Sequence, residues 1–169
     1  MNHRIVTEYR RIRSQMAPLT PRGIPRGTHH ARYCLDIARV RVRFEDAERE
    51  GLVRFETPYD EIADVDYLTC DRECFDTDEQ HERHVRETID RANDKGVWGI
   101  RTFARLTPDD DWEEADAVWG FIGEDWVDSG YDDDMRRAAL DLLARMQEEA
   151  KGMQEISEGC LIVDGCDCR

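Results

Sequence analysis

The sequence has 169 residues, 40% of them hydrophobic, and a formal net charge of −15 at pH 7. This length and composition favour one soluble domain with a core of its own. The longest apolar run, residues 117–122, is far shorter than the roughly 20 residues of a membrane-spanning helix. No apolar segment follows the first arginines as it does in a signal peptide, so we expect a cytoplasmic protein.

Charge is distributed unevenly along the chain. Residues 1–44 contain ten arginines against Glu8 and Asp36, a net charge of +8, which leaves −23 for residues 45–169. We expect a basic arm on an acidic body that nucleic acid repels and basic protein surfaces attract. The chain has only two lysines against 22 arginines, so a GC-rich genome or a high-salt cytoplasm is an alternative source of the acidity.

The first half of the chain predicts an arm, a helix and a strand. Residues 1–28 contain three of the five prolines among arginines, which predicts a flexible basic arm or a loosely packed cover. Hydrophobic residues at helical spacing then predict a helix near residues 30–50, although the alternation "RVRVRF" leaves a strand as an alternative. Residues 52–57 alternate and end before Pro58, as a short strand does.

The second half predicts a further helix, a hairpin and a last helix. A capping box at Thr77 and Gln80 predicts a helix over residues 78–94. Residues 96–106 and 115–122 alternate on either side of a polar turn, which predicts a β-hairpin. An amphipathic pattern over 132–150 predicts the last helix, with Asp132, Asp133 and Asp134 at its positive end.

These elements predict an α+β fold: a small three-stranded, mainly antiparallel sheet packed by about three helices. We expect a single domain over residues 29–150 and a cysteine-containing tail over 151–169. Trp98 and Trp119 lie on the hairpin strands beside glycines, and we expect both rings in the core.

The six cysteines point to thiols or metal ligands and not to a disulfide framework. Cys70, Cys74, His81 and His84 have the ligand types of a zinc site, but their spacing is not that of a zinc finger. His81 also lies on the apolar stripe of a predicted helix, where a packed histidine is the simpler interpretation. We therefore expect no cofactor, with a zinc ion as the alternative.

Several segments resemble a group of uncharacterised small proteins of phages, proviruses and plasmids. The resemblance covers roughly residues 40–148 and is carried by "EREGLVRFETPYDE", "GVWGIRTFARL", "ADAVWGFIGEDW" and "GYDDDM". In this group a "GLVR" strand precedes a hairpin and an x-W-G-[IF] strand, followed by an acidic turn and a helix; the present chain lacks the usual serine-leucine start of that strand. The resemblance implies an accessory protein of a mobile element and transfers no catalytic residues.

Two classes of function follow. The sequence contains no phosphate-binding loop, nucleophile elbow or H-E-x-x-H helix, which favours a non-enzymatic protein without deciding the question. The first hypothesis is an acidic protein that mimics nucleic acid and binds a basic host protein or nucleoprotein complex, as an anti-CRISPR or anti-restriction inhibitor does. The second is a small accessory domain, with or without zinc, that is acidic because of its host.

The first hypothesis predicts a partner-facing surface at the carboxylates of the hairpin and of the following helix. We expect residues 109–114 to project from the same edge of the molecule as residues 124–134. An exposed aromatic residue among charges is a typical interface anchor, and Trp126 has no obvious place in the core. The candidate partner-binding residues are Glu124, Asp125, Trp126, Asp128, Asp132, Asp133 and Asp134.

Overall fold

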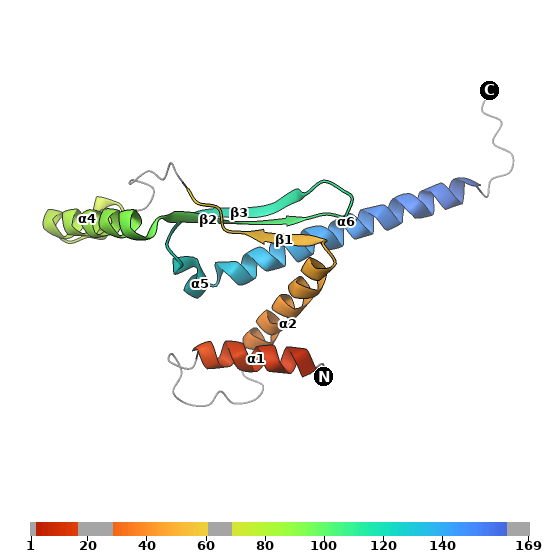
Figure 1. Ribbon diagram of the computed structural model, residues 1–169, viewed down its shortest axis with the longest axis horizontal. Helices are drawn as coiled ribbons and strands as arrows, with labels where there is room; N and C mark the ends of the chain where they lie inside the picture. The colour runs from red at the N-terminus through yellow and green to blue at the C-terminus, as the bar shows by residue number, and fades with distance from the viewer. Residues whose placement is uncertain (1–2, 17–28, 61–68, 162–169) are drawn as a thin grey trace, which may run out of the picture.

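The computed structural model describes residues 3–16, 29–60 and 69–161. Its elements are α1 (His3–Met16), α2 (His29–Arg49), β1 (Val53–Glu56), the 3-10 helix η2 (Arg72–Cys74), α4 (Asp78–Lys95), β2 (Val97–Ala104), β3 (Glu113–Ile122), α5 (Asp125–Ser129) and α6 (Tyr131–Leu161). Figure 1 shows the sheet lying along one side of α6, with α2 crossing below it. The predicted α+β class is confirmed, and the predicted strands and helices are found close to their expected bounds except for the end of the last helix.

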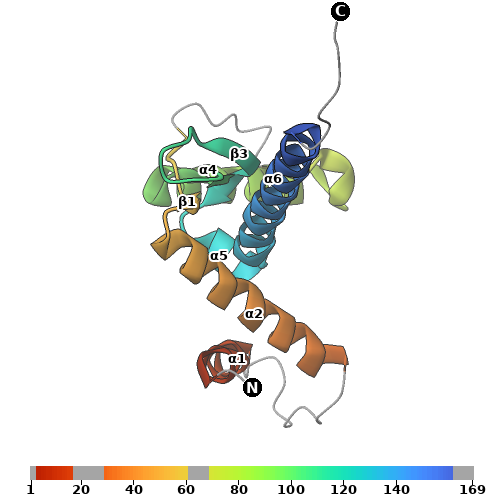
Figure 2. The same ribbon diagram turned by 90° about the vertical axis from the view of Figure 1, so that its right-hand side faces the viewer.

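The sheet has the order β1-β2-β3, and both pairs of strands are antiparallel. The main core forms where one face of the sheet meets α2 and α6, as Figure 2 shows. Its buried residues are Phe44, Ala47, Val53, Ala104, Ala139, Leu140, Leu142 and Leu143. Because side chains alternate along a strand, Gly99, Arg101 and Phe103 lie on the opposite face of β2 from Ala104.

The expectation of a flexible arm is corrected for residues 3–16, which form helix α1. Ile12 of α1 is buried in a second small core with Cys34, Ile37 and Ala38 of α2, and Ile5 packs against this cluster. The apolar residues of α1 recur at helical spacing, but the arginines between them hide the pattern in the sequence. The rest of the predicted arm, residues 17–28, lies outside the described residues.

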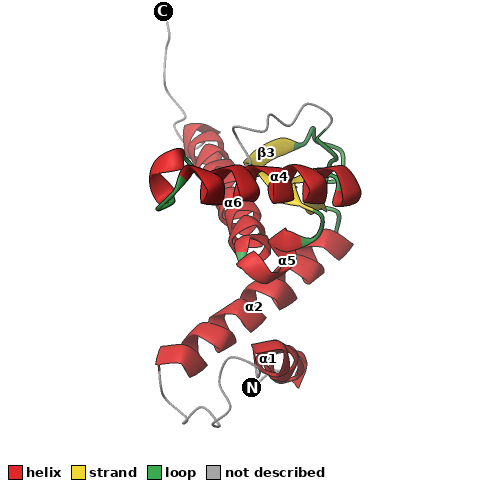
Figure 3. Ribbon diagram, turned by 90° about the vertical axis from the view of Figure 1, so that its left-hand side faces the viewer, coloured by secondary structure: helices red, strands yellow, loops and turns green. Residues whose placement is uncertain are grey.

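Helix α4 lies at one end of the sheet, remote from α1 (Figures 1 and 3). The predicted capping box is present, because Thr77 accepts a hydrogen bond from the Gln80 amide and Gln80 binds the Thr77 amide in return. Thr88 is the one buried residue of this helix, and the main contacts of α4 are with β3 and η2. The described residues therefore leave most of the surface of α4 exposed to solvent.

Two further expectations change. Helix α6 continues to Leu161, beyond the predicted end at residue 150, so the first part of the expected tail is helical; residues 162–169 lie outside the described part. Trp119 is 37% exposed, which corrects its expected place in the core. No helix in the described ranges combines the length and the apolar character that a membrane span requires.

Candidate interaction surface

Exposed carboxylates concentrate where β2 turns into β3. This group, the acidic hairpin tip, consists of Asp109, Asp110, Asp111, Glu113, Glu114 and Asp116, all exposed. Three of them have local partners. Asp110 accepts hydrogen bonds at 2.8 Å from the amide and the hydroxyl of Thr107, Glu114 accepts one at 2.7 Å from Nε of Arg101, and Asp116 accepts one from the Ala117 amide.

The other three carboxylates of the tip, Asp109, Asp111 and Glu113, make no ion pair with another described residue. They are separated by one residue each along the chain, and like charges this close repel one another. Arg105, which lies over Trp112, and Arg101, which pairs with Glu114, offset only part of that repulsion. A basic surface brought against the tip would lower it.

A stack of arginines and aromatic rings attaches the tip to the sheet. The guanidinium carbon of Arg105 lies 4.1 Å from the ring centroid of Trp112, and that of Arg54 lies 4.8 Å from the same ring. Arg54 also lies 4.6 Å from the ring of Phe103, whose other neighbour is Arg101 at 4.8 Å. Each cation is thus held over the negative face of a ring.

The stack was not predicted from the sequence. Arg54 and Phe103 face each other only because β1 pairs with β2 in the observed register, and a sequence does not state that register. Arg105 also donates a hydrogen bond at 2.7 Å to the carbonyl of Gly51. The start of the turn is therefore tied both to Trp112 and to the backbone before β1.

The predicted anchor Trp126 is half-buried. Its ring lies 5.7 Å from that of Phe55 in a tilted arrangement. Trp126 forms one wall of a cleft of about 280 Å³ that is also lined by Thr57, Lys95, Trp98, Gly123 and Glu124. The expectation that Trp126 lacks a packing partner is corrected, although part of the ring faces this cleft.

Glu124 and Asp125 lie at the start of α5, and both are exposed. Glu124 is the N-cap residue of that helix but makes no side-chain capping bond. Asp125 forms an ion pair with Arg91 of α4. Glu124 thus remains available at the edge of the cleft, whereas Asp125 connects α5 to α4.

Asp132 and Asp133 do not project from the surface as expected. They are only 6% and 5% exposed, and the physical reason is that arginines from two helices neutralise them inside the fold. Arg41 of α2 binds both oxygens of Asp133, at 2.5 and 2.9 Å, and Arg136 donates to Asp132 at 2.7 Å. These carboxylates join α6 to α2 and are not accessible to a partner.

The third acid of this triplet differs from the other two. The side chain of Asp134 is 70% exposed and pairs with Arg137 one turn along the helix. The side chain of Asp128 lies outside the described residues. Of the seven predicted partner-binding residues, the structure therefore places Glu124, Asp125 and Asp134 at the surface and Trp126 partly so.

The buried pairs also stabilise the charge of Arg41. Burial disfavours that charge, but the hydrogen bond to Asp133 and the charges of Asp133, Asp132 and Glu8 outweigh burial and raise the pKa of the guanidinium. Glu8 comes from α1 and lies 3.7 Å from Arg41. One arginine thus links the first two helices to the start of α6.

The two acidic segments of the predicted partner-facing surface lie at opposite ends of β3. Residues 109–114 lie at the turn end of the hairpin, whereas residues 124–134 follow the opposite end of the ten-residue strand. A strand rises about 3.3 Å per residue, so the two groups are roughly 30 Å apart along β3. The two groups of carboxylates therefore do not lie at one edge of the molecule, contrary to the prediction. The acidic hairpin tip and the cleft beside Trp126 are separate parts of the surface.

The predicted zinc ligands are placed as follows. Cys70 and Cys74 are exposed thiols, while the rings of His81 and His84 lie 5.5 and 5.1 Å from that of Phe75. In the described ranges, no three or more histidine, cysteine or acidic side chains are grouped as a metal site requires. Of the cysteine-containing tail predicted over 151–169, Cys166 and Cys168 lie outside the described residues.

Comparison with protein-family models, with curated proteins and with solved structures gave no match for this chain.

Proposed function

We propose that the protein is a non-enzymatic interaction protein of a mobile genetic element and that its acidic hairpin tip binds a basic, nucleic-acid-binding surface of a host defence complex. Such a protein would act as an anti-CRISPR or anti-restriction inhibitor that substitutes for nucleic acid. The origin in a mobile element rests on the sequence resemblance described above. The mode of binding rests on the distribution of charge in the structure.

One observation carries the proposal: the fold pairs its inner carboxylates with arginines, whereas three of the six carboxylates of the tip have no ion-pair partner among the described residues. Asp132 and Asp133 are enclosed by arginines, whereas Asp109, Asp111 and Glu113 have no ion-pair partner among the described residues. Six carboxylates lie within residues 109–116, a local density that a generally acidic surface does not require. This concentration favours a role in binding.

The negative charge of the acidic hairpin tip indicates which class of partner it would bind. Grooves that bind nucleic acid present lysine and arginine to closely spaced phosphates. A rigid loop with closely spaced carboxylates is attracted to such a groove by the same forces. The stack of Arg105, Trp112 and Arg54 holds the tip against the sheet, so little conformational freedom is lost when the tip binds.

The proposal is tested by capture of proteins from lysate of the host cell. The triple variant Asp109→Asn, Asp111→Asn, Glu113→Gln removes three charges from the tip without changing side-chain size. A matched control, Asp141→Asn, Glu148→Gln, Glu149→Gln, removes three exposed charges from α6. We expect the same basic protein to be captured by the wild type and the control and to be lost with the tip variant.

The salt dependence separates charge mimicry from an accessory domain that is acidic only because of its host. A complex held by surface charges weakens steeply between low and physiological salt. Capture that is unaffected by salt, or capture that the tip and control variants reduce equally, would contradict the proposal.

A further inference from the structure

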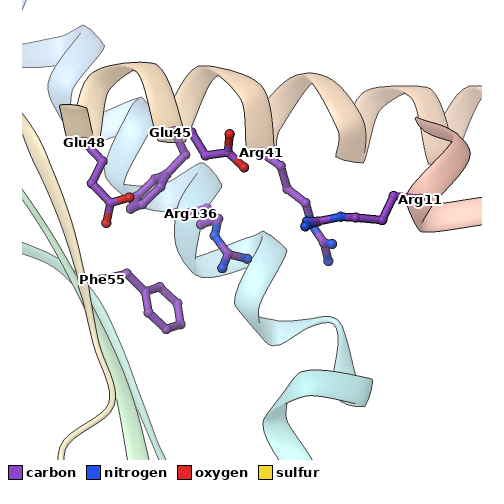
Figure 4. Close-up of a pocket in the computed structure, with 7 residues that line it drawn as sticks. Arg11, Arg41, Glu45, Glu48, Phe55 and Arg136 are labelled. Atoms are coloured by element: carbon purple, nitrogen blue, oxygen red, sulfur yellow. The ribbon is translucent and has the colours of Figure 1, made fainter. Parts of the chain in front are cut away.

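A second candidate site lies between α1, α2, β1 and α6 and shares no residue with the acidic hairpin tip. It is a cleft of about 360 Å³ lined by Arg11, Arg41, Phe44, Glu45, Glu48, Phe55 and Arg136. Figure 4 shows Glu45 and Glu48 on the α2 side, with Arg136 and Phe55 facing them and Arg11 at the end nearer α1. Nothing in the proposed function uses this cleft.

The arginines of the cleft differ in how many of their donors are already used. Arg41 binds Asp133 through two nitrogens, and one of these also reaches Asp132. Arg136 uses only Nη1 for hydrogen bonds to described residues, and its guanidinium lies over the ring of Phe55 at 5.0 Å. Arg136 therefore keeps Nε–H and Nη2–H donors, which suit an incoming carboxylate or other oxyanion.

Arg11 provides more donors at the same end of the cleft. Its Nε and Nη2 lie 3.0 and 2.7 Å from one oxygen of Glu8, which leaves Nη1 to bind a ligand. The side chain is about half exposed, so it can turn toward a ligand at little cost. Arg11 and Arg136, which both line the cleft, thus each keep at least one donor for an anionic group.

The other end of the cleft is acidic. Glu48 is exposed and makes no ion pair with a described residue, and Glu45, one turn earlier on α2, pairs with Arg4. Arg41 and Glu48 are seven residues apart on α2, which corresponds to roughly 10 Å along the helix axis. The cleft thus offers unused guanidinium donors at one end and an unpaired carboxylate at the other, with Phe44 and Phe55 among the residues that line it.

We propose that this cleft binds a small zwitterion with a carboxylate at one end, an ammonium group at the other and an apolar spacer between them. The carboxylate is bound by Arg11 and Arg136, the ammonium by Glu48, and the spacer lies against Phe44 and Phe55. A simple anion leaves Glu48 without a partner, and a simple amine leaves the unused donors of Arg11 and Arg136 without one. Omega-amino acids and lysine-like molecules belong to this class.

The test uses 6-aminohexanoate as the probe and the full-length protein, with hexanoate and hexylamine as one-ended controls. Calorimetric titration and thermal unfolding are the two readouts, because a ligand that binds the folded state raises the midpoint of unfolding. We expect saturable binding of 6-aminohexanoate and binding of each control compound that is weaker by about tenfold or more, since each lacks one charge-assisted contact.

The variants Glu48→Gln and Arg11→Gln change one end of the cleft each. Arg136 is left unchanged because it also binds Asp132. The matched control is Arg137→Gln, whose side chain is exposed on the same helix and does not line the cleft. We expect Glu48→Gln and Arg11→Gln to weaken binding by about tenfold and Arg137→Gln to leave it unchanged.

Each other outcome overturns the proposal. Absence of saturable binding by the wild type does so directly. Equal binding of hexanoate, or of hexylamine, shows that one end alone determines affinity. Equal binding by Glu48→Gln and the wild type, with folding confirmed by the unfolding midpoint, shows that the probe binds elsewhere. A negative result for the cleft does not affect the proposed role of the acidic hairpin tip, because that role involves none of the residues that line the cleft.

Discussion

The indole ring of Trp119 covers Gly99 on the neighbouring strand. The two residues are direct partners in the β2–β3 register, and a β-carbon at position 99 would lie 2.3 Å from Cε3 of Trp119. The ring therefore shields a stretch of central strand that has no side chain of its own. This relationship explains why a tryptophan that is 37% exposed can still contribute to stability.

The pair gives a prediction about stability. Gly99→Ala is expected to reduce the free energy of unfolding by about 1–3 kcal/mol, because the new methyl group overlaps the ring. Trp119→Ala is expected to reduce it by about 1–2 kcal/mol, less than the 3–5 kcal/mol of a fully buried tryptophan. Urea unfolding of both single variants and of the double variant provides the measurement.

The double variant decides whether the ring is the cause. Once Trp119 is removed, Gly99→Ala has no ring to displace, so its additional cost should fall to a few tenths of a kcal/mol. An unchanged cost in that background would show that backbone conformation, and not Trp119, requires glycine at this position.

A second prediction compares neighbouring acids at the start of α6. Asp133→Asn removes the bidentate partner of the buried Arg41, to which Asp132 and Glu8 remain close, and is expected to cost about 2–3 kcal/mol, as loss of a charged hydrogen-bonding partner does. Asp134→Asn removes an exposed pair with Arg137 and is expected to cost less than about 1 kcal/mol. Equal losses in chemical unfolding would mean that Asp133 is not enclosed as described.

These acids also show what the sequence could and could not provide. The periodicities predict the three strands, the hairpin and the amphipathic helices, because those patterns record which side of an element is apolar. The sequence does not indicate which aspartate of "DDD" faces inward. That choice depends on Arg41, 91 residues before Asp132 in the chain, and on the packing of α2 across α6.

The sequence likewise predicts only part of the candidate interaction surface. The acidic hairpin tip could be located, because a carboxylate-rich turn between two alternating strands is visible in the sequence. Its separation from residues 124–134 follows from the length and direction of β3, which the pattern of charges in the sequence does not contain. Helix α1 was missed because its apolar residues are too few to stand out among arginines.

A third prediction concerns the cysteines. Cys34 is fully buried between α1 and α2, whereas Cys70 and Cys74 are exposed. A thiol-alkylating reagent applied to the native protein should label Cys70 and Cys74 rapidly and Cys34 only after unfolding. Peptide mapping by mass spectrometry distinguishes the sites. Labelling of Cys34 as fast as Cys70 would show that α1 detaches from α2 in the native protein.

A fourth prediction follows from the pKa of the same thiol. Burial raises the pKa of the Cys34 thiol above its ordinary value, since the thiolate is poorly solvated there. The folded state therefore binds the proton more tightly than the unfolded state. The resulting contribution to stability is fully present below the unfolded pKa and is lost as pH rises through the folded pKa.

The matching experiment compares the wild type with Cys34→Ala in chemical unfolding from pH 8 upward. We expect the wild type to lose more stability than the variant above about pH 9. Parallel curves for the two proteins would show that the thiol keeps an ordinary pKa in the fold.

The most direct measurement of the proposed function is a competition experiment with the host protein that the wild type captures. Fluorescence anisotropy follows a labelled DNA duplex bound to that purified protein while the acidic protein is added. We predict complete displacement of the duplex by the wild type and by the α6 control variant. The tip variant Asp109→Asn, Asp111→Asn, Glu113→Gln should need at least about tenfold higher concentration. Formation of a ternary complex with the duplex still bound, or displacement by the tip variant at the wild-type concentration, would contradict charge mimicry by the hairpin tip.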